Sequence, residues 1–377
     1  MLTSTRPKAA VVSVMMGIFS LVTTEILPIG LLTPIGSNFG ISAGTAGLMM
    51  TMPGLLAAVA APAVTVATGR FDRRVMLCVL MLVLAAADFL AAIAPAYWVM
   101  IVSRVLVGFV IGAFWSIGSG LAARLVRPDR VGMATAVIFS AVPLGSVLGV
   151  PAGTLIGDLA GWRVAFTVMG MLALAVFAAL MLVLPALPAE QTTSLTVLRE
   201  LLREPRVRLG LLVTFLIVLA HFGTYTYVTP FLRQVTGASP ELITLFLLVY
   251  GIAGIAGNFV AGMARLRVAF TVSACAVAAA TLMLPLAGRF GAGAVILLAI
   301  WGLAYGAVPV CSQTWFAKSA PHAREAATVV FTSSFQATLS LGALLGGVVV
   351  DLTSPSIVML IGGAVALLAA AALTIDV

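Results

Sequence analysis

The sequence predicts an all-α membrane protein, with twelve transmembrane helices in two pseudo-symmetric six-helix bundles. Of its 377 residues, 62% are hydrophobic and only 8% are charged, whereas soluble domains carry about 25% charged residues. Apolar runs of about 20 residues recur along the whole chain, and each is long enough to cross a hydrocarbon layer of about 30 Å as a helix. A repeated spacing of polar residues and glycines then divides the runs into two sets of six.

The apolar runs define the expected spans in chain order. The first run follows Arg6 and Lys8, as a secretory signal would, but its length, the lack of a small-residue cleavage pattern and the eleven later runs favour a retained helix. The one substantial polar interruption lies between the sixth and seventh runs. We therefore expect an N-terminal bundle over residues 1–188, a cytoplasmic linker over 189–208 and a C-terminal bundle over 209–377. The expected spans are residues 10–34, 43–68, 75–94, 97–122, 133–157, 164–184, 209–231, 242–264, 268–287, 293–316, 326–349 and 356–375.

The placement of the basic residues explains the net charge of +8. Of the 20 basic residues, 16 fall in segments on the same side as the N-terminus, and one, Arg104, lies within a span. Only Arg163, Arg233 and Arg289 fall on the other side. This bias follows the positive-inside rule and predicts that both termini are cytoplasmic. The expected partner of the surface is a lipid bilayer and not nucleic acid, because no basic patch is interleaved with aromatic residues.

The two halves repeat one another in the spacing of unusual residues. Glu25 lies nine residues before Pro34, and His221 lies nine before Pro230, at an offset of 196. A repeat of this kind predicts two halves of like topology related about the membrane normal, with a site between them near mid-membrane. The other matching segments are Gly108-x-x-x-Gly112 with Gly302-x-x-x-Gly306, and Leu148-Gly149-x-x-x-Gly153-x-x-x-x-Asp158 with Leu341-Gly342-x-x-x-Gly346-x-x-x-x-Asp351.

Four segments of the chain are distinctive: TTEILPIGLLTPIG (23–36), SRVLVGFVIGAFWSIGS (103–119), LGSVLGVPAGTLIGDLAGWR (144–163) and AHFGTYTYVTPF (220–231). They resemble the major facilitator superfamily, and in particular its bacterial sugar efflux transporters within the drug:proton antiporter group. The resemblance covers nearly the whole chain. The segment at 144–163 is similar to the glycine-proline signature of span five in antiporters, so the resemblance implies export. It also implies a monomer of the bacterial inner membrane with no cofactor or metal.

Two segments are expected to take part in conformational change. The family pattern after span two is Gly-x-x-x-Asp-Arg-x-Gly-Arg-Arg, whereas residues 65–74 read TVATGRFDRR and move the aspartate to Asp72. We expect this loop to face the cytoplasm and leave open whether its usual inter-helix salt bridge forms. On span five, small residues allow close approach and the proline frees carbonyls, which indicates a hinge or a tight seam. The residues concerned are Arg70, Asp72, Arg73, Arg74, Gly145, Gly149, Pro151 and Gly153.

Three ionisable residues lie deep within expected spans: Glu25, Asp88 and Arg104. Such residues are costly in a bilayer and need a partner or a water-filled cavity. At a rise of 1.5 Å per residue they lie roughly 13, 9 and 10 Å from the outer ends of their spans, at a similar depth. We hypothesise that Glu25 exchanges a proton while Arg104 responds to its charge. Asp88 is the weaker candidate and could serve only to anchor Arg104, and a static ion-pair lock is the alternative for the whole set.

A second set of polar and aromatic residues is suited to a solute with many hydrogen-bonding groups. His221 matches Glu25 in the repeat, and it is a candidate second proton carrier or sugar hydrogen-bonding group, with a satisfied core histidine as the alternative. Tyr225 lies one helical turn after it. Sugars also need aromatic faces against their C–H surfaces. The remaining candidates for substrate binding are Thr24, Glu25, Trp115, Asn258, Gln313 and Gln336.

The sequence favours transport over other functions. The leading hypothesis is a proton-coupled exporter of small polar solutes, with sugars as the first class, and the alternative is a multidrug or chloramphenicol-type exporter. A membrane-embedded enzyme would need a catalytic or metal-binding cluster, but the chain holds only two histidines, His221 and His322. Its three cysteines lie in separate spans without ligand spacing and are expected to be inert core thiols. A sensor or scaffold would normally add a soluble domain, and the longest polar segment is about 20 residues.

Overall fold

The computed structural model describes residues 5–67, 71–118, 121–188, 200–263, 265–320 and 324–374, and every regular element in these ranges is a helix. Twelve helical segments are long and apolar enough to cross a membrane, which confirms the twelve expected spans. Arg70, His322 and residues 189–199 of the expected linker lie outside the described ranges.

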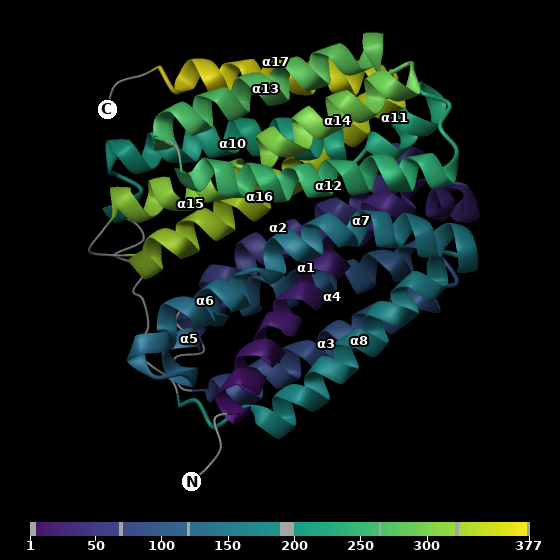
Figure 1. Cartoon of the computed structure of the whole chain (residues 1–377). Helices are drawn as coiled ribbons and strands as arrows, with labels where there is room; N and C mark the ends of the chain where they lie inside the picture. The colour runs from purple at the N-terminus through teal and green to yellow at the C-terminus, as the bar shows by residue number, and fades with distance from the viewer. Residues whose placement is uncertain are drawn as a thin grey trace.

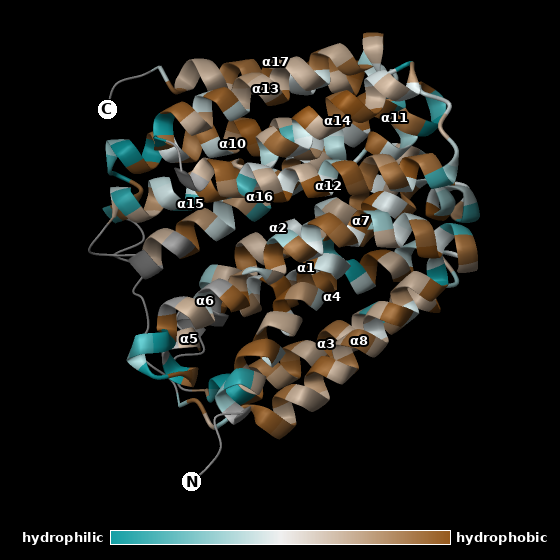
Figure 2. Ribbon diagram, viewed as in Figure 1, coloured by the Kyte–Doolittle hydropathy of each residue, from teal (hydrophilic) through white to brown (hydrophobic). Residues whose placement is uncertain are grey.

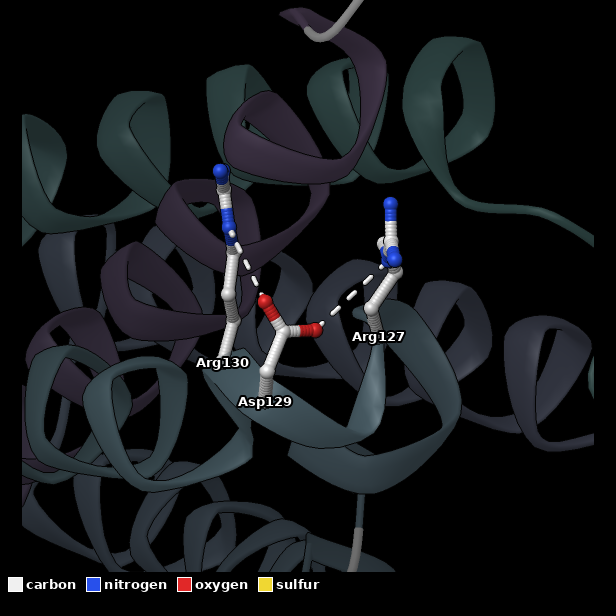
Figure 3. Close-up of polar contacts among 3 residues, drawn as sticks. All are labelled: Arg127, Asp129 and Arg130. Atoms are coloured by element: carbon white, nitrogen blue, oxygen red, sulfur yellow. Dashed lines mark ion pairs between the residues drawn. The ribbon is translucent and has the colours of Figure 1, made fainter.

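The described residues of the N-terminal half form nine helical elements (Figure 1). A short turn after α5 holds an exposed pair of contacts, in which Asp129 lies 3.6 Å from Arg127 and 3.9 Å from Arg130 (Figure 3). Exposed ion pairs of this kind contribute little to stability. The elements are α1 (Thr5–Phe39), α2 (Ala43–Ala67), α3 (Arg73–Ala92), α4 (Tyr97–Gly118), α5 (Leu121–Leu125), η1 (Pro128–Arg130), α6 (Val131–Phe139), α7 (Ala141–Ala160) and α8 (Trp162–Val183).

The described helices of the C-terminal half follow the same order of long spans. The first of them begins at Pro205, four residues before the expected start of span seven, because proline is well tolerated at the first helical position. The elements are α10 (Pro205–Tyr225), α11 (Val228–Gln234), α12 (Pro240–Met263), α13 (Leu266–Ala287), α14 (Gly291–Gly306), α15 (Val308–Ser319), α16 (Arg324–Leu352) and α17 (Pro355–Ala372).

Three expected spans are each divided into two helices at a proline. A proline lacks the N–H that would bond to the carbonyl four residues earlier. Pro143 follows the break between α6 and α7, Pro230 the break between α10 and α11, and Pro309 the break between α14 and α15. Each helix break thus lies within a few residues before a proline.

The two halves repeat the same helix pairings. In the N-terminal half α1 packs against α7, α2 against α4, and α3 against both α4 and α8. The corresponding spans of the other half pair in the same way, with α10 against α16, α12 against α14, and α13 against both α14 and α17. The halves meet through α2 with α16 and through α7 with α12, which are themselves equivalent pairs under the repeat. The packing therefore has the pseudo-symmetry that the sequence predicts.

The bundle has two distinct ends. We call the end at which α1 begins and α17 ends the terminal end, and the other the opposite end (Figure 1). Hydrophilic residues gather at both ends, while the middle of the helices is largely hydrophobic (Figure 2). The ribbons of the two halves lie close together at the opposite end and diverge toward the terminal end (Figure 1).

The glycines of α7 line a tight seam with α1. A Cβ atom at Gly149 would lie 2.9 Å from Ile26, and one at Gly153 would lie 2.9 Å from Leu27. Gly145, one turn earlier, faces Val22 at 3.1 Å. Glycines spaced four residues apart lie on one face of a helix and let two backbones approach closely. The sequence indicates either a hinge or a tight seam for this segment, and these contacts are those of a tight seam.

The loop after span two is held by Asp72. Its Oδ1 accepts a hydrogen bond from the backbone N–H of Arg74 at 2.8 Å, which caps α3, and its Oδ2 accepts another from the N–H of Leu187 at 3.1 Å. The Arg74 side chain donates to the carbonyl of Met181 at 2.5 Å. Apart from the cap of α3 itself, these partners are backbone groups of α8 and the segment after it.

The three cysteines are expected from the sequence to lie in the core. This expectation is wrong for Cys275, which is exposed on α13.

Candidate functional site

Arg104 of α4 lies at the centre of the polar residues of the N-terminal half and is fully buried. Its Nη1 donates to the carbonyl of Thr24 and its Nη2 to the carbonyl of Glu25, both at 3.1 Å. Its Nε donates to the carbonyl of Met49 in α2, also at 3.1 Å. One guanidinium group therefore joins three helices through backbone oxygens.

Two prolines explain why those carbonyls need a donor. Pro28 in α1 cannot bond to the carbonyl of Thr24, four residues earlier, and Pro53 in α2 leaves the carbonyl of Met49 free in the same way. A buried carbonyl without a partner is costly in a membrane. The planar, permanently charged guanidinium of Arg104 supplies both donors at once.

Among the described contacts, the carboxylates of Asp88 and Glu25 do not form hydrogen bonds with the Arg104 guanidinium. Asp88 of α3 is fully buried and accepts a hydrogen bond from the Thr24 hydroxyl at 3.1 Å. Glu25 is 6% exposed, and the Gln336 side chain of α16, in the other half, interacts favourably with its carboxylate. The charge of Arg104 acts electrostatically on both carboxylates. The three guanidinium hydrogen bonds themselves all go to backbone, so the direct ion-pair lock is not the geometry found here.

The contact between Glu25 and Gln336 lies at a polar junction between the halves. Gly54 of α2 faces Ser340 and Gln336, and a side chain at this position would collide with them. Three oxygens here are buried without a protein partner: Glu25 Oε1, Gln336 Oε1 and Ser340 Oγ. Buried polar atoms normally have a hydrogen-bond partner. A group of unpaired oxygens between two bundles is therefore suited to receiving a proton, a water molecule or a solute hydroxyl.

An aromatic cluster surrounds His221 in the C-terminal half. The imidazole stacks on Tyr305 with ring centres 3.2 Å apart and on Tyr225 at 5.1 Å. Trp301 meets it edge to face at 5.6 Å, and Tyr250 stacks on Tyr225 at 4.5 Å. His221 Nδ1, Trp301 Nε1 and Tyr305 Oη are buried without a protein partner. The cluster thus combines aromatic faces with unused hydrogen-bonding groups.

The structure brings some predicted site residues together and leaves others apart. Trp115 packs against Phe139 at 6.2 Å in the core of its own half. Asn258 is half-buried on α12, and Gln313 is exposed on α15. The Thr24 hydroxyl is occupied by Asp88. None of these lies among the contacts described for Glu25 and Gln336 or in the cluster at His221, and the Thr24 carbonyl bonds to Arg104.

Sequence reasoning missed three members of the aromatic cluster: Tyr250, Trp301 and Tyr305. A signal was available in the sequence, because each of these residues directly precedes a glycine of a helix-packing segment. Trp301 and Tyr305 precede the two glycines of the repeated Gly302-x-x-x-Gly306 segment. A Cβ atom at Gly302 would collide with the carbonyl of Tyr250. The glycines bring α14 close to α12, and this contact places the aromatic rings together.

Residues 13–338 match the model of the Major Facilitator Superfamily. The chain belongs to this superfamily. Major facilitator proteins are membrane transporters, so the chain is a multi-pass transporter of a small-molecule substrate and not an enzyme. This membership also confirms the fold class that the sequence predicts.

Individual relatives cover most of this major facilitator chain. The "Transcription regulatory protein OpdE" of Pseudomonas aeruginosa is 33% identical over 359 residues, which cover 93% of this chain and 89% of that protein. A bacterial homologue of the human lysosomal transporter Spinster, solved in an inward-facing and unoccupied conformation, superposes with a TM-score of 0.78 at 15% identity over 98% of this chain and 97% of that one. The human organic anion transporter MFSD10 gives 0.71 at 17% identity, over 97% and 99%. These two structures share the fold.

Proposed function

We propose that the protein is a proton-coupled exporter of small polar solutes, with sugars as the first substrate class. The observation that carries this proposal is the group of buried, unpaired oxygens of Glu25, Gln336 and Ser340 at the junction between the halves. It includes a carboxylate that can gain and lose a proton. A transporter that alternates between two states needs a link of this kind to couple proton movement to the movement of its halves.

The coupling follows from the chemistry of the carboxylate. An ionised Glu25 can accept a charge-assisted hydrogen bond from the Gln336 amide, which is stronger than a bond between neutral groups. Protonation from the opposite end removes the charge, weakens this bond and lessens the attraction to Arg104. The change in charge shifts the balance between the state that opens at the opposite end and the state that opens at the terminal end. Release of the proton toward the terminal end restores the charged contact and resets the cycle.

The proposed solute site combines the junction at Glu25 with the cluster at His221. A pyranose ring offers C–H faces for the rings of Trp301 and Tyr305, and hydroxyls for the unpaired atoms of both halves. His221 then serves as a hydrogen-bonding group beside the Tyr305 and Trp301 rings. The unpaired oxygens at the junction suit a solute with several hydroxyls.

The orientation is part of the proposal. We assign the terminal end to the cytoplasm, because Arg73 and Arg74 at the start of α3, Arg127 and Arg130 between α5 and α6, and Arg265 before α13 lie there. Export then runs from the terminal end to the opposite end. We propose that the protein acts as a monomer in a bacterial inner membrane, with residues 1–188 and 209–377 as its moving halves.

A substrate screen in proteoliposomes tests the function. Purified protein is reconstituted, a pH gradient is imposed, and the movement of arabinose, lactose, isopropyl-thiogalactoside and chloramphenicol is measured. We expect gradient-driven movement of at least one sugar and none of chloramphenicol. Movement of chloramphenicol alone would instead establish the alternative, a drug exporter.

The aromatic cluster provides a second test in the same assay. Replacing Trp301 with leucine removes a ring face and an N–H donor, and we expect KM for the transported solute to rise about tenfold or more, as loss of a hydrogen bond and a stacking contact implies. Tyr305→Phe keeps the ring and should have a smaller effect. Trp98→Leu is the matched control, because Trp98 is 69% exposed on α4. An unchanged KM in Trp301→Leu would place the solute elsewhere.

A role in gene regulation is the second candidate, since the 33% identical relative is named a transcription regulatory protein. A transporter can act in this way indirectly, by changing the internal concentration of an inducing solute. The proteoliposome screen separates the two candidates. A folded protein that moves none of a broad set of solutes would favour a regulatory role that does not depend on transport.

A further inference from the structure

The aspartates that end the repeated glycine segments have no part in the function proposed above. Asp351 lies in the last turn of α16, in the C-terminal half, and α2 of the other half begins beside it. Its Oδ1 accepts a hydrogen bond from the backbone N–H of Gly44 at 2.8 Å. Its Oδ2 accepts another from the hydroxyl of Ser42 at 2.5 Å. One carboxylate thus binds the first turn of a helix in the opposite half.

The position of this carboxylate is electrostatically favourable. The first N–H groups of a helix have no partner within the helix and carry a partial positive charge. Ser42 caps α2 in the usual way, since its Oγ accepts a hydrogen bond from the N–H of Thr45 at 3.0 Å. Asp351 satisfies another of these groups, at Gly44, and brings the negative charge. It therefore caps α2 from across the interface between the halves.

The surrounding contacts hold the opposite end closed. A Cβ atom at Gly44 would collide with the carbonyl of Gly347 and with the Asp351 carboxylate, so the two helices touch through their backbones. Tyr227 packs against Gly47 and donates to the carbonyl of Ala343 at 2.7 Å. The hydrogen bond to Ala343 lies within the C-terminal half and holds the Tyr227 ring in place, whereas its contact with Gly47 crosses between the halves. That contact, like the hydrogen bonds of Asp351, depends on the halves staying together at this end.

The repeat counterpart lacks this geometry. Asp158 ends the matching segment in α7, and the helix it approaches is α12. The first turn of α12 holds its own acid, Glu241, whose carboxylate accepts a hydrogen bond from Ser239 at 2.6 Å. Asp158 interacts with Glu241 unfavourably and with Arg233 favourably. The pseudo-symmetry therefore places an aspartate at both interfaces between the halves. In the described contacts, Asp351 caps a helix of the other half and Asp158 does not.

We propose that Asp351 is a positioning residue of the transport cycle. Its carboxylate caps the first turn of α2 and stabilises the state in which the opposite end is closed. These hydrogen bonds must break each time the halves part at that end. The role is independent of which solute is moved and of whether Glu25 carries a proton.

The distance between the halves at the opposite end tests this role. The native cysteines Cys78, Cys275 and Cys311 are first replaced. Spin labels are then attached through Ile93→Cys, directly after α3, and Phe290→Cys, directly before α14. Both positions lie at the opposite end, one in each half, and their side chains are 74% and 72% exposed. Electron-electron resonance then reports the distribution of distances. We expect Asp351→Asn to raise the longer-distance population about threefold or more, as loss of a partly exposed charged contact implies.

Further variants separate this role from a general loss of stability. Ser42→Ala removes one of the two hydrogen bonds and should give a smaller shift. Combined with Asp351→Asn it should add less than its full effect, because the two changes share an interaction. Asp129→Asn, an exposed acid at the other end, is the control and should leave the distances unchanged. Unchanged distances in Asp351→Asn, or an equal shift in Asp158→Asn, would overturn the proposal.

Discussion

Glu25→Gln is expected to abolish solute movement driven by a pH gradient while leaving solute exchange in place. Glutamine keeps the shape of the side chain and can still bond to Gln336, but it cannot carry a proton. The loss should therefore fall on the coupling and not on the fold. Gradient-driven transport in proteoliposomes should drop to the level of liposomes without protein. Exchange of labelled for unlabelled solute should persist and lose its dependence on pH.

The matched control is Glu241→Gln, an exposed acid at the start of α12. It removes the same charge and should leave both assays unchanged. Full gradient-driven transport in Glu25→Gln would contradict the proton role of Glu25. Such a result would still leave the protein a transporter, since a solute can move down its own gradient without coupling.

Arg104→Leu is expected to destabilise the protein by about 3 kcal/mol or more. Each buried carbonyl left without a donor costs about 1 to 3 kcal/mol, and this change frees those of Thr24 and Met49 together. It also removes the positive charge near two buried carboxylates. Chemical unfolding in detergent, followed by circular dichroism, measures the loss. Arg104→Lys should be intermediate, because an ammonium lacks the planar fork of donors.

A second pair of variants tests whether the carbonyls left free by the prolines cause the loss of stability in Arg104→Leu. Pro28→Ala restores the N–H that bonds to the carbonyl of Thr24 within α1, so it should recover part of the stability lost in Arg104→Leu. Arg130→Leu, in an exposed ion pair, is the control and should lie within error of the unchanged protein. Equal stability of Arg104→Leu and the unchanged protein would show that the carbonyls of Thr24 and Met49 find another hydrogen-bond donor.

The outline of the fold could be predicted because a bilayer imposes a strict length and polarity on each span. The twelve apolar runs, the division into two halves and the burial of Glu25, Asp88 and Arg104 within the protein followed from this. Proline breaks within the spans could have been anticipated from Pro143, Pro230 and Pro309, whose missing N–H groups act over four residues. These are local effects, and local sequence contains them.

The sequence by itself determined which residues are too polar to face lipid, because that cost depends only on the side chain and its depth. Only the tertiary structure decided how they are satisfied. Arg104 bonds to carbonyls freed by prolines in two other helices, Glu25 reaches Gln336 more than 300 residues away, and Asp351 caps α2 while its repeat counterpart does not. Each of these contacts depends on the rotation and closeness of helices from distant parts of the chain. Hydrophobic periodicity leaves those quantities open, because every face of a helix in a membrane is largely apolar.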